Sequence, residues 1–260
     1  MMTNAEFKAR LVAREPMLGA FIKTPHPIVI EIMARAGFDF LVVDAEHAPF
    51  DRGTVDAMTM AGRAEGCPIV VRVPVATADW VLNVLDGGAA GVMVPHVETA
   101  AQAKELARAV TYGPGGRGFA GTSRAADYAG RSLKEHLSVA RSEVALICQI
   151  EDPDGVVNHS DIAEVDGVDA LFIGRADLAV SHGLSDFFAP EVAKMTRDIL
   201  SATGAATGLY CAPTEPLDAH RDAGGSFFVV GSEHTLMQLG GVALVEDFKK
   251  RETRADMTMK

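Results

Sequence analysis

Two acidic residues, Glu151 and Asp177, each stand just after a short apolar segment and are the first candidates for chemistry. The segments cover residues 144–150 (VALICQI) and 168–174 (VDALFIG). If they are adjacent parallel strands, the two carboxylates can converge on one ion, and oxygen ligands suit Mg²⁺, Mn²⁺ or a similar hard cation. Two protein ligands leave positions open for water and substrate. The alternative is a pair of exposed acids, or for Asp177 a cap of a helix that begins at Leu178.

An arginine, Arg72, interrupts the apolar stretch VVRVP. An unpaired charge inside a folded core is costly, so this side chain needs an anionic partner. Its guanidinium fork can hold a carboxylate through two parallel hydrogen bonds. Arg72 is therefore a candidate clamp for a substrate carboxylate, with a structural ion pair as the alternative.

A third polar group, formed by Asp44, Glu46 and His47, ends the apolar segment 39–45 (DFLVVDA). A carboxylate three residues upstream can orient an imidazole and raise its basicity, so Asp44 and His47 form a candidate acid–base pair. The other histidines show no comparable pairing, although two of them, His182 and His234, could lie near the same rim. They are His26, His96, His136, His159, His182, His220 and His234.

Eight short apolar segments alternate with longer amphipathic ones. Their continuous hydrophobicity indicates strands buried on both faces, as in a parallel sheet covered by helices. Eight such units favour a closed (β/α)₈ TIM barrel over an open doubly wound sheet, and no G-x-G-x-x-G motif follows the first segment. The predicted strands are 17–23, 39–45, 68–74, 90–96, 144–150, 168–174, 207–212 and 226–231.

The length of 260 residues fits a single barrel domain covering residues 1–260. We expect an N-terminal helix at 4–14, the barrel at about 17–250 and a C-terminal tail at 251–260.

One segment, residues 111–132, interrupts the alternation of strands and helices, because it contains six glycines and no clear strand. Long loops inside compact domains usually have a function. Because the segment comes after the fourth predicted strand, we expect it at the C-terminal rim, where barrel active sites are built. The favoured role is to cover the substrate. Phosphate binding is the alternative, although the segment does not match the P-loop pattern.

The composition of the chain excludes several classes of binding partner. The net charge of −11 argues against nucleic acid and anionic membranes, and it means that an anionic substrate must be received by local cations. The start of the chain lacks the apolar stretch of a signal peptide, and no run reaches the roughly 20 apolar residues of a membrane helix. The three widely spaced cysteines, Cys67, Cys148 and Cys211, suggest no disulfide framework. We therefore expect a cytoplasmic protein with a small-molecule substrate.

Taken together, the motifs resemble the HpcH/HpaI aldolase family, the class II, metal-dependent pyruvate aldolases. The matching stretches run from about residue 17 to 235 and are FDFLVVDAEHAPFD, VRVP, GAAGVMVPHVETAAQA, GPGGRG, QIEDPDGVVN and VDALFIGRADLAVSHG. The resemblance implies a TIM barrel of the phosphoenolpyruvate/pyruvate type. It also implies reversible cleavage of 4-hydroxy-2-oxo acids, such as hydroxy-oxo-heptanedioate and 2-keto-3-deoxy sugar acids, to pyruvate and an aldehyde.

The resemblance assigns roles to the residues at the strand ends. Glu151 and Asp177 would bind one divalent ion per subunit, either Mg²⁺, Mn²⁺ or Co²⁺. Arg72 would hold the pyruvate carboxylate, helped by the backbone N–H groups of Ala176 and Asp177. Gln149 would sit beside the keto oxygen.

The resemblance also implies a proton shuttle and an assembly. His47, oriented by Asp44, would move the proton of the 4-hydroxyl, either directly or through a water that it activates. Family members form hexamers built from three dimers, and the two chains of each dimer exchange the last barrel helix, for which the candidate here is TLMQLGGVALVEDFKKR.

Three places depart from the family pattern. Arg175 stands where many relatives have proline, His182 where an apolar residue is common, and 123–128 diverges slightly in the loop. Arg175 adds a charge beside Asp177 that could change the preference for the aldehyde or the field at the metal. We place the choice of aldehyde, which the sequence leaves open, in the rim loops and around 210–214.

Three rival hypotheses remain. A class I aldolase would need a Schiff-base lysine, and Lys23 is a poor candidate because strand one supplies no acid–base partner in this interpretation. A CoA-ester lyase of the citrate lyase β or malyl-CoA type would share the barrel and the metal, but no basic segment suits a CoA diphosphate. A non-catalytic pyruvate-binding barrel predicts a damaged set of site residues, whereas every expected role is filled.

Overall fold

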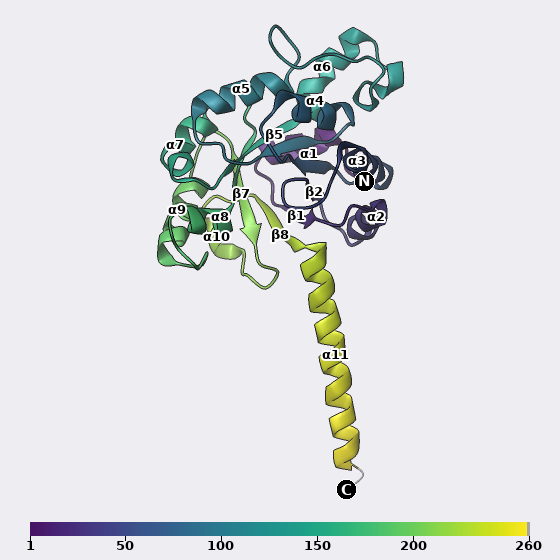
Figure 1. Cartoon of the computed structure of the whole chain (residues 1–260), viewed down its shortest axis with the longest axis vertical. Coiled ribbons are helices and arrows are strands. Elements are labelled where there is room, and N and C mark those ends of the chain that lie inside the picture. Colours follow the sequence, from purple (N-terminus) through teal and green to yellow (C-terminus); the bar gives the residue numbers. More distant parts are fainter. Residues whose placement is uncertain (259–260) are drawn as a thin grey trace.

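Eight parallel strands form a closed barrel in which each strand pairs with its neighbours in sequence and β8 returns to β1 (Figure 1). The computed structural model describes the backbone of residues 1–258 and the side chains of residues 1–251. All eight predicted strands are confirmed, with ends that differ by two residues or fewer. The strands are β1 (Met17–Ile22), β2 (Phe40–Asp44), β3 (Ile69–Arg72), β4 (Gly91–Val94), β5 (Ala145–Ile150), β6 (Ala170–Ile173), β7 (Ala206–Cys211) and β8 (Phe227–Ser232).

Helices alternate with the strands and cover the outside of the barrel, as expected for the TIM-barrel class. The helices are α1 (Asn4–Val12), α2 (Pro27–Arg35), α3 (Arg52–Glu65), α4 (Ala78–Asp86), α5 (Ala100–Val110), η1 (Arg124–Ala129), α6 (Leu133–Glu143), α7 (Pro153–Ala163), α8 (Arg175–Ser181), α9 (Pro190–Leu200), α10 (Asp218–Asp222) and α11 (Glu233–Thr258).

Aromatic side chains fill the barrel and close one of its ends. The rings of Phe40 and Phe172 lie 6.4 and 6.0 Å from that of Phe227. Below them α1, which begins with a capping box at Thr3, buries Phe7 against Phe40 with ring centroids 5.4 Å apart. Because α1 closes the amino ends of the strands, the carboxyl ends are left for a site.

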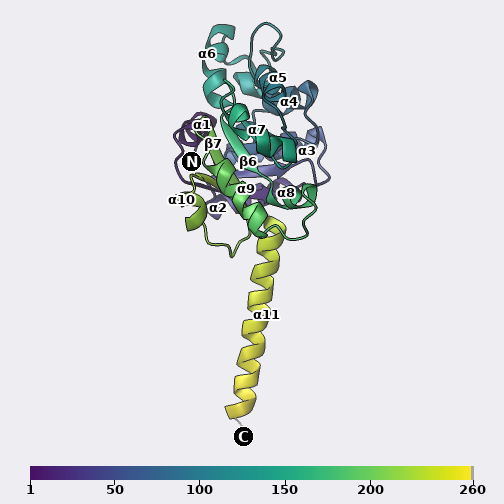
Figure 2. The same cartoon turned by 90° about the vertical axis from the view of Figure 1, so that its left-hand side faces the viewer.

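The glycine-rich segment 111–132 is not at the expected rim. Helix α5 stands between strand β4 and this segment and carries the chain back to the amino ends of the strands. There Arg117 contacts Asp86 at 2.5 Å, and Arg124 donates to the carbonyl of Gly87 at 2.9 Å. Figure 2 shows α6 at the end of the molecule remote from α11. The segment therefore does not cover a substrate at the mouth of its own barrel.

The last helix, α11, extends away from the barrel instead of packing on it (Figures 1 and 2). Its 26 residues correspond to about 39 Å of helix. Several of its apolar side chains are at least 43% exposed: Met237, Leu239, Val242, Leu244, Val245 and Phe248. The helix includes 251–258 of the expected tail, and residues 259–260 lie outside the described part.

A glycine in the barrel wall gives a stability test. A Cβ at Gly208 in β7 would lie 2.1 Å from the backbone oxygen of Phe227, which cannot move without breaking the β7–β8 pairing. We expect Gly208→Ala to lower the free energy of unfolding by about 1–3 kcal/mol, measured by urea titration. Gly118→Ala is the matched control, because nothing lies within 4 Å of its Cβ position. Equal stability of the two variants would contradict this packing.

Candidate active site

A buried ion pair joins the ends of strands β2 and β3. Asp44 and Arg72 are partners in the strand register, so their side chains meet without any loop between them. Arg72 donates from Nε to Asp44 Oδ1 at 2.9 Å, and its Nη2 lies 2.8 Å from Oδ2. Burial acts to raise the pKa of Asp44, but the hydrogen bond and the charge of Arg72 outweigh it and hold this pKa below its usual value.

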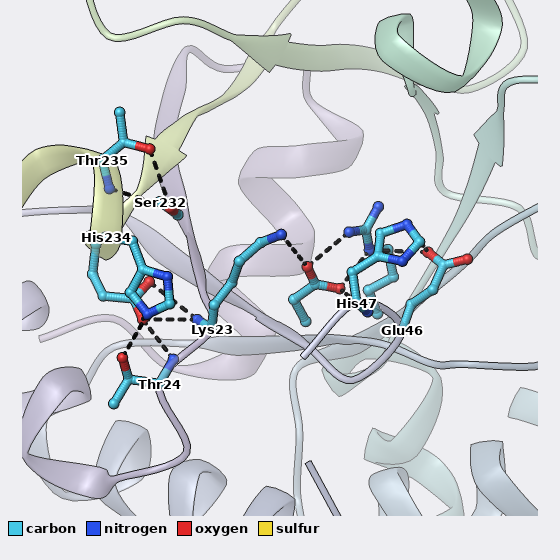
Figure 3. A network of polar contacts seen from close by, with 10 residues as sticks. Lys23, Thr24, Glu46, His47, Ser232, His234 and Thr235 are labelled. Atoms are coloured by element: carbon cyan, nitrogen blue, oxygen red, sulfur yellow. Dashed lines mark hydrogen bonds and ion pairs between the residues drawn. The ribbon is translucent and has the colours of Figure 1, made fainter. Parts of the chain in front are cut away.

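Lys23 reaches the same carboxylate from the end of β1. Its Nζ lies 3.2 Å from Asp44 Oδ2, so the expectation that strand one has no acid–base partner was wrong. The backbone here is held by buried Glu233, whose Oε1 accepts hydrogen bonds from the N–H groups of Lys23 at 2.9 Å and Thr24 at 2.6 Å. In Figure 3 the Lys23 side chain extends between His234 on one side and His47 and Glu46 on the other.

His47 contacts Asp44 through its backbone and not through its imidazole. The His47 N–H donates to Asp44 Oδ1 at 3.2 Å. The exposed imidazole has its Nε2 3.8 Å from Glu46 Oε2, and Figure 3 shows the two side chains together. Glu46 in turn lies 3.2 Å from Nε of Arg72. The expected pairing of Asp44 with the imidazole is therefore replaced by one with Glu46, while Asp44 orients the turn.

Glu151 lies buried after the end of β5, beneath the start of α8. The Gln149 amide donates to its Oε2, and the backbone N–H of His96 donates to its Oε1 at 3.1 Å. Burial raises the pKa of Glu151, more than these hydrogen bonds and the His96 imidazole lower it. A Cβ at Gly174 would lie 2.5 Å from Glu151 Oε2, so glycine is required there for the carboxylate to fit.

Asp177 is exposed in the first turn of α8, next to Ala176. The charge of Asp177 adds to the rise in the Glu151 pKa, by less than burial does. The first N–H groups of a helix have no partner within the helix, so those of Ala176 and Asp177 can bind an anion. Because β5 and β6 are paired, the predicted residues at the end of β5 and in α8 lie on the same side of the mouth.

The donor atoms on this side fit a divalent cation. Oxygens of Glu46 and Glu151 and a ring nitrogen of His96 lie within 4.8 Å of one another. The buried oxygen Gln149 Oε1 accepts no hydrogen bond within the described part of the chain, whereas Glu46 Oε2 lies in ion-pair contact with Arg72 and His47. Two carboxylates and one buried amide oxygen without a donor match the ligands that hard cations prefer.

His96 is a residue that the sequence interpretation missed. Its Nδ1 lies 2.8 Å from Asp152 and 3.5 Å from Glu151, and its Nε2 lies 3.8 Å from Glu46. It also has a positive φ of 55°, which is uncommon outside glycine. Its only signal in the sequence is its place directly after the strand GVMVP.

Arg175, which departs from the family pattern beside Asp177, directs its charge toward Glu215 and not toward the proposed metal ligands. Its guanidinium is buried, contacts both oxygens of Glu215 at 2.8 and 2.5 Å, and donates to the carbonyl of Tyr210. Glu215 also contacts His220 at 2.7 Å. Arg175 therefore ties the start of α8 to the loop after β7.

Two other histidines, His182 and His234, contact groups outside the Asp44–Arg72 ion pair. His182 contacts the carbonyl of Leu178 at 2.8 Å at the end of α8, and His234 contacts Thr24 Oγ1 at 2.9 Å (Figure 3).

The three cysteines are buried, free thiols. Burial raises the pKa of each to about 12, which suits packing and not nucleophilic chemistry.

Comparison with known proteins agrees with this geometry. The family model described as HpcH/HpaI aldolase/citrate lyase matches residues 17–238. A hydroxypyruvate/pyruvate aldolase of Paraburkholderia phytofirmans is 36% identical over 87% of this chain and 90% of its own. A 5-keto-4-deoxy-D-glucarate aldolase of Escherichia coli is 34% identical over 94% of this chain and 97% of its own.

A solved structure supports the same relationship. The crystal structure of a HpcH/HpaI aldolase/citrate lyase family protein from Burkholderia cenocepacia is 33% identical, with a TM-score of 0.88 over 94% of this chain and 99% of its own. The chain is therefore an aldolase-type lyase that belongs to the HpcH/HpaI aldolase/citrate lyase family.

Proposed function

We propose that this enzyme uses one divalent metal to cleave 4-hydroxy-2-oxo acids reversibly into pyruvate and an aldehyde. The observation that carries the proposal is the division of the mouth into two parts. Glu151 and Asp177 follow the adjacent strands β5 and β6, and the Asp44–Arg72 pair stands at the ends of β2 and β3. The names of the aldolase relatives from P. phytofirmans and E. coli support the same reaction.

In this proposal Glu151 and Asp177 hold the metal, which is Mg²⁺, Mn²⁺ or Co²⁺. When bound, the metal supplies a Lewis acid for the 2-oxo group of the substrate. Gln149, which already donates to Glu151, lies beside the keto oxygen. His96 supplies an imidazole and Glu46 a second carboxylate beside Glu151.

Arg72 binds the substrate with only part of its guanidinium. Asp44 and Glu46 occupy its Nε and Nη2 groups, while Nη1 donates no hydrogen bond to a described residue. We assign Nη1 and the N–H groups of Ala176 and Asp177 to the pyruvate carboxylate. The structural ion pair and the substrate contact are thus two uses of one side chain.

His47 takes the proton of the 4-hydroxyl group, directly or through a water molecule. Its exposed imidazole lies next to the Glu46 carboxylate, which can stabilise the imidazolium after transfer. The C3–C4 bond then breaks and the aldehyde leaves. The electron pair of that bond stays on the pyruvate fragment, whose C3 takes up a proton to give pyruvate.

The CoA-ester reaction is the second candidate, because the family description also names citrate lyase. The relatives described above carry aldolase names at 34–36% identity, which favours the aldol reaction. A substrate panel with 4-hydroxy-2-oxo acids and citryl- or malyl-CoA separates the two reactions. A pyruvate-binding barrel without turnover is the third outcome of this panel.

We propose that the chain is a single domain that assembles as a homo-hexamer, built as a trimer of dimers in which the two partners exchange α11. The supporting observation is that α11 leaves its own barrel with exposed apolar side chains. We also propose a cytoplasmic location, supported by the free cysteines. No described helix has the length and apolarity to cross a membrane.

Metal removal tests the proposed chemistry first. We expect EDTA to lower pyruvate release by about 100-fold or more, because no side chain replaces the Lewis acid, and added Mn²⁺ should restore it. Glu151→Gln should weaken Mn²⁺ binding in calorimetry, whereas Glu164→Gln, an exposed acid outside the proposed site, should not. Full turnover in chelator would rule out the metal model.

A lysine in place of Arg72 tests the substrate clamp. Arg72→Lys keeps the charge but loses the planar fork, so we expect kcat/KM for pyruvate release to fall by about 100-fold. Arg52→Lys is the control, since Arg52 pairs with Asp79 in an exposed position. Thermal unfolding shows whether the variants are folded. A loss of less than threefold in a folded Arg72→Lys protein would contradict the assignment.

Charges placed on α11 test the assembly. Leu244 and Phe248 are one turn apart and 72% and 59% exposed, so Leu244→Asp with Phe248→Asp should disrupt an exchanged interface. Light scattering should find six 27.5-kDa chains in the wild type and a smaller species in the double variant. Asp247→Ala on the same helix is the control. A wild-type monomer would refute the assembly.

A further inference from the structure

Polar contacts run in one unbroken series around the mouth of the barrel. Lys23 contacts Asp44 at 3.2 Å, and Asp44 contacts Arg72 at 2.8 Å. Arg72 lies 3.2 Å from Glu46, whose other oxygen lies 3.8 Å from His96. His96 lies 3.5 Å from Glu151, so the series ends at the proposed metal ligand. Lys23 stands at its far end.

The barrel places these two ends on opposite sides. Lys23 follows β1 and Glu151 follows β5, and strands four positions apart face each other across a closed barrel of eight. The proposed function places the 2-oxo acid end between Glu151 and Arg72 and the 4-hydroxyl group at His47. The other end of the substrate then lies beyond His47, on the side where Figure 3 shows Lys23. Lys23 lies on the side toward which that end extends.

The ammonium of Lys23 has capacity for a ligand. It contacts only Asp44 among the residues that the structure describes, and its side chain is 31% exposed. An ammonium has three donors, so two are left. The other two cations of the mouth, Arg72 and Arg175, have side chains only 7% and 5% exposed, and each faces a carboxylate.

The described residues around Lys23 fix the position of its backbone and leave the remaining donors of its ammonium group free. Glu233 holds its backbone N–H at 2.9 Å, which sets where the side chain begins. Two residues earlier on β1, the Phe21 ring lies under the Arg72 guanidinium at 4.6 Å and 6.2 Å from the Tyr210 ring. This part of the mouth has an apolar floor with one accessible cation above it.

We propose that Lys23 is a specificity-determining residue that binds a carboxylate on the aldehyde half of the substrate. The inference rests on the proposed function, because it assumes that the 2-oxo acid end lies near Glu151. In a chain with a net charge of −11 an anionic group needs a local cation, and Lys23 provides it on the side of the barrel opposite Glu151. The enzyme therefore favours aldehydes that bear a carboxylate over neutral ones of similar size.

Two substrates that differ only in this group test the assignment. Cleavage of 4-hydroxy-2-oxoglutarate gives glyoxylate, which carries a carboxylate, and cleavage of 4-hydroxy-2-oxopentanoate gives neutral acetaldehyde. The readout is the ratio of kcat/KM for the first substrate to that for the second. We expect Lys23→Met to lower this ratio by about 10- to 100-fold, the size of a lost charge-assisted hydrogen bond. Lys23→Arg should restore most of it.

The alternative is that Lys23 acts only by stabilising Asp44. In that case Lys23→Met lowers kcat/KM for both substrates by the same factor, and the ratio stays within threefold of the wild-type value. That result overturns the assignment, whereas an unequal loss supports it. Lys23→Gln, which keeps a hydrogen-bond donor, repeats the test if the Met variant does not fold.

The wild-type measurement separates this inference from the proposed function. Wild-type enzyme that releases pyruvate, with equal losses in Lys23→Met, overturns the role of Lys23 alone. Wild-type enzyme that releases no pyruvate from either compound in the presence of Mn²⁺ overturns the proposed function and the inference together.

Discussion

Four carboxylates around one end of the barrel, those of Asp44, Glu46, Glu151 and Asp177, need positive charge between them. Arg72 and Lys23 neutralise Asp44 and hold its pKa low. Glu151 has hydrogen bonds but no buried cation among the side chains that the structure describes, and burial raises its pKa. A divalent ion would supply the missing charge. The same imbalance that makes this side of the mouth acidic thus prepares it for a metal.

The barrel meets this requirement through strand order. Consecutive parallel strands place their carboxyl ends side by side, so residues far apart in the sequence become neighbours in chain order around the mouth. The register of β2 and β3 sets Asp44 directly beside Arg72. Glycine at 174 leaves room for the Glu151 carboxylate below α8. The chemistry is therefore a property of strand ends and needs little from the loops.

The strands could be identified from the sequence because they are continuous apolar segments. The polar site residues could be identified because most of them come directly after such a segment. The position of residues 111–132 was predicted wrongly. Helix α5 follows β4 and returns the chain to the amino ends of the strands before this segment begins. The partners of Lys23, His96 and Arg175 depend on contacts between strands that no local pattern shows. The imidazole of His47 likewise faces Glu46, one residue away, and not Asp44.

The most direct test of the metal-centred account is a crystal structure of the enzyme with Mn²⁺ and pyruvate, in which anomalous scattering locates the ion. The account predicts one Mn²⁺ held by the carboxylates of Glu151 and Asp177, with pyruvate between the ion and Arg72. An ion elsewhere with pyruvate at Lys23 as a covalent adduct would contradict it, because the reaction would then belong to the Schiff-base class.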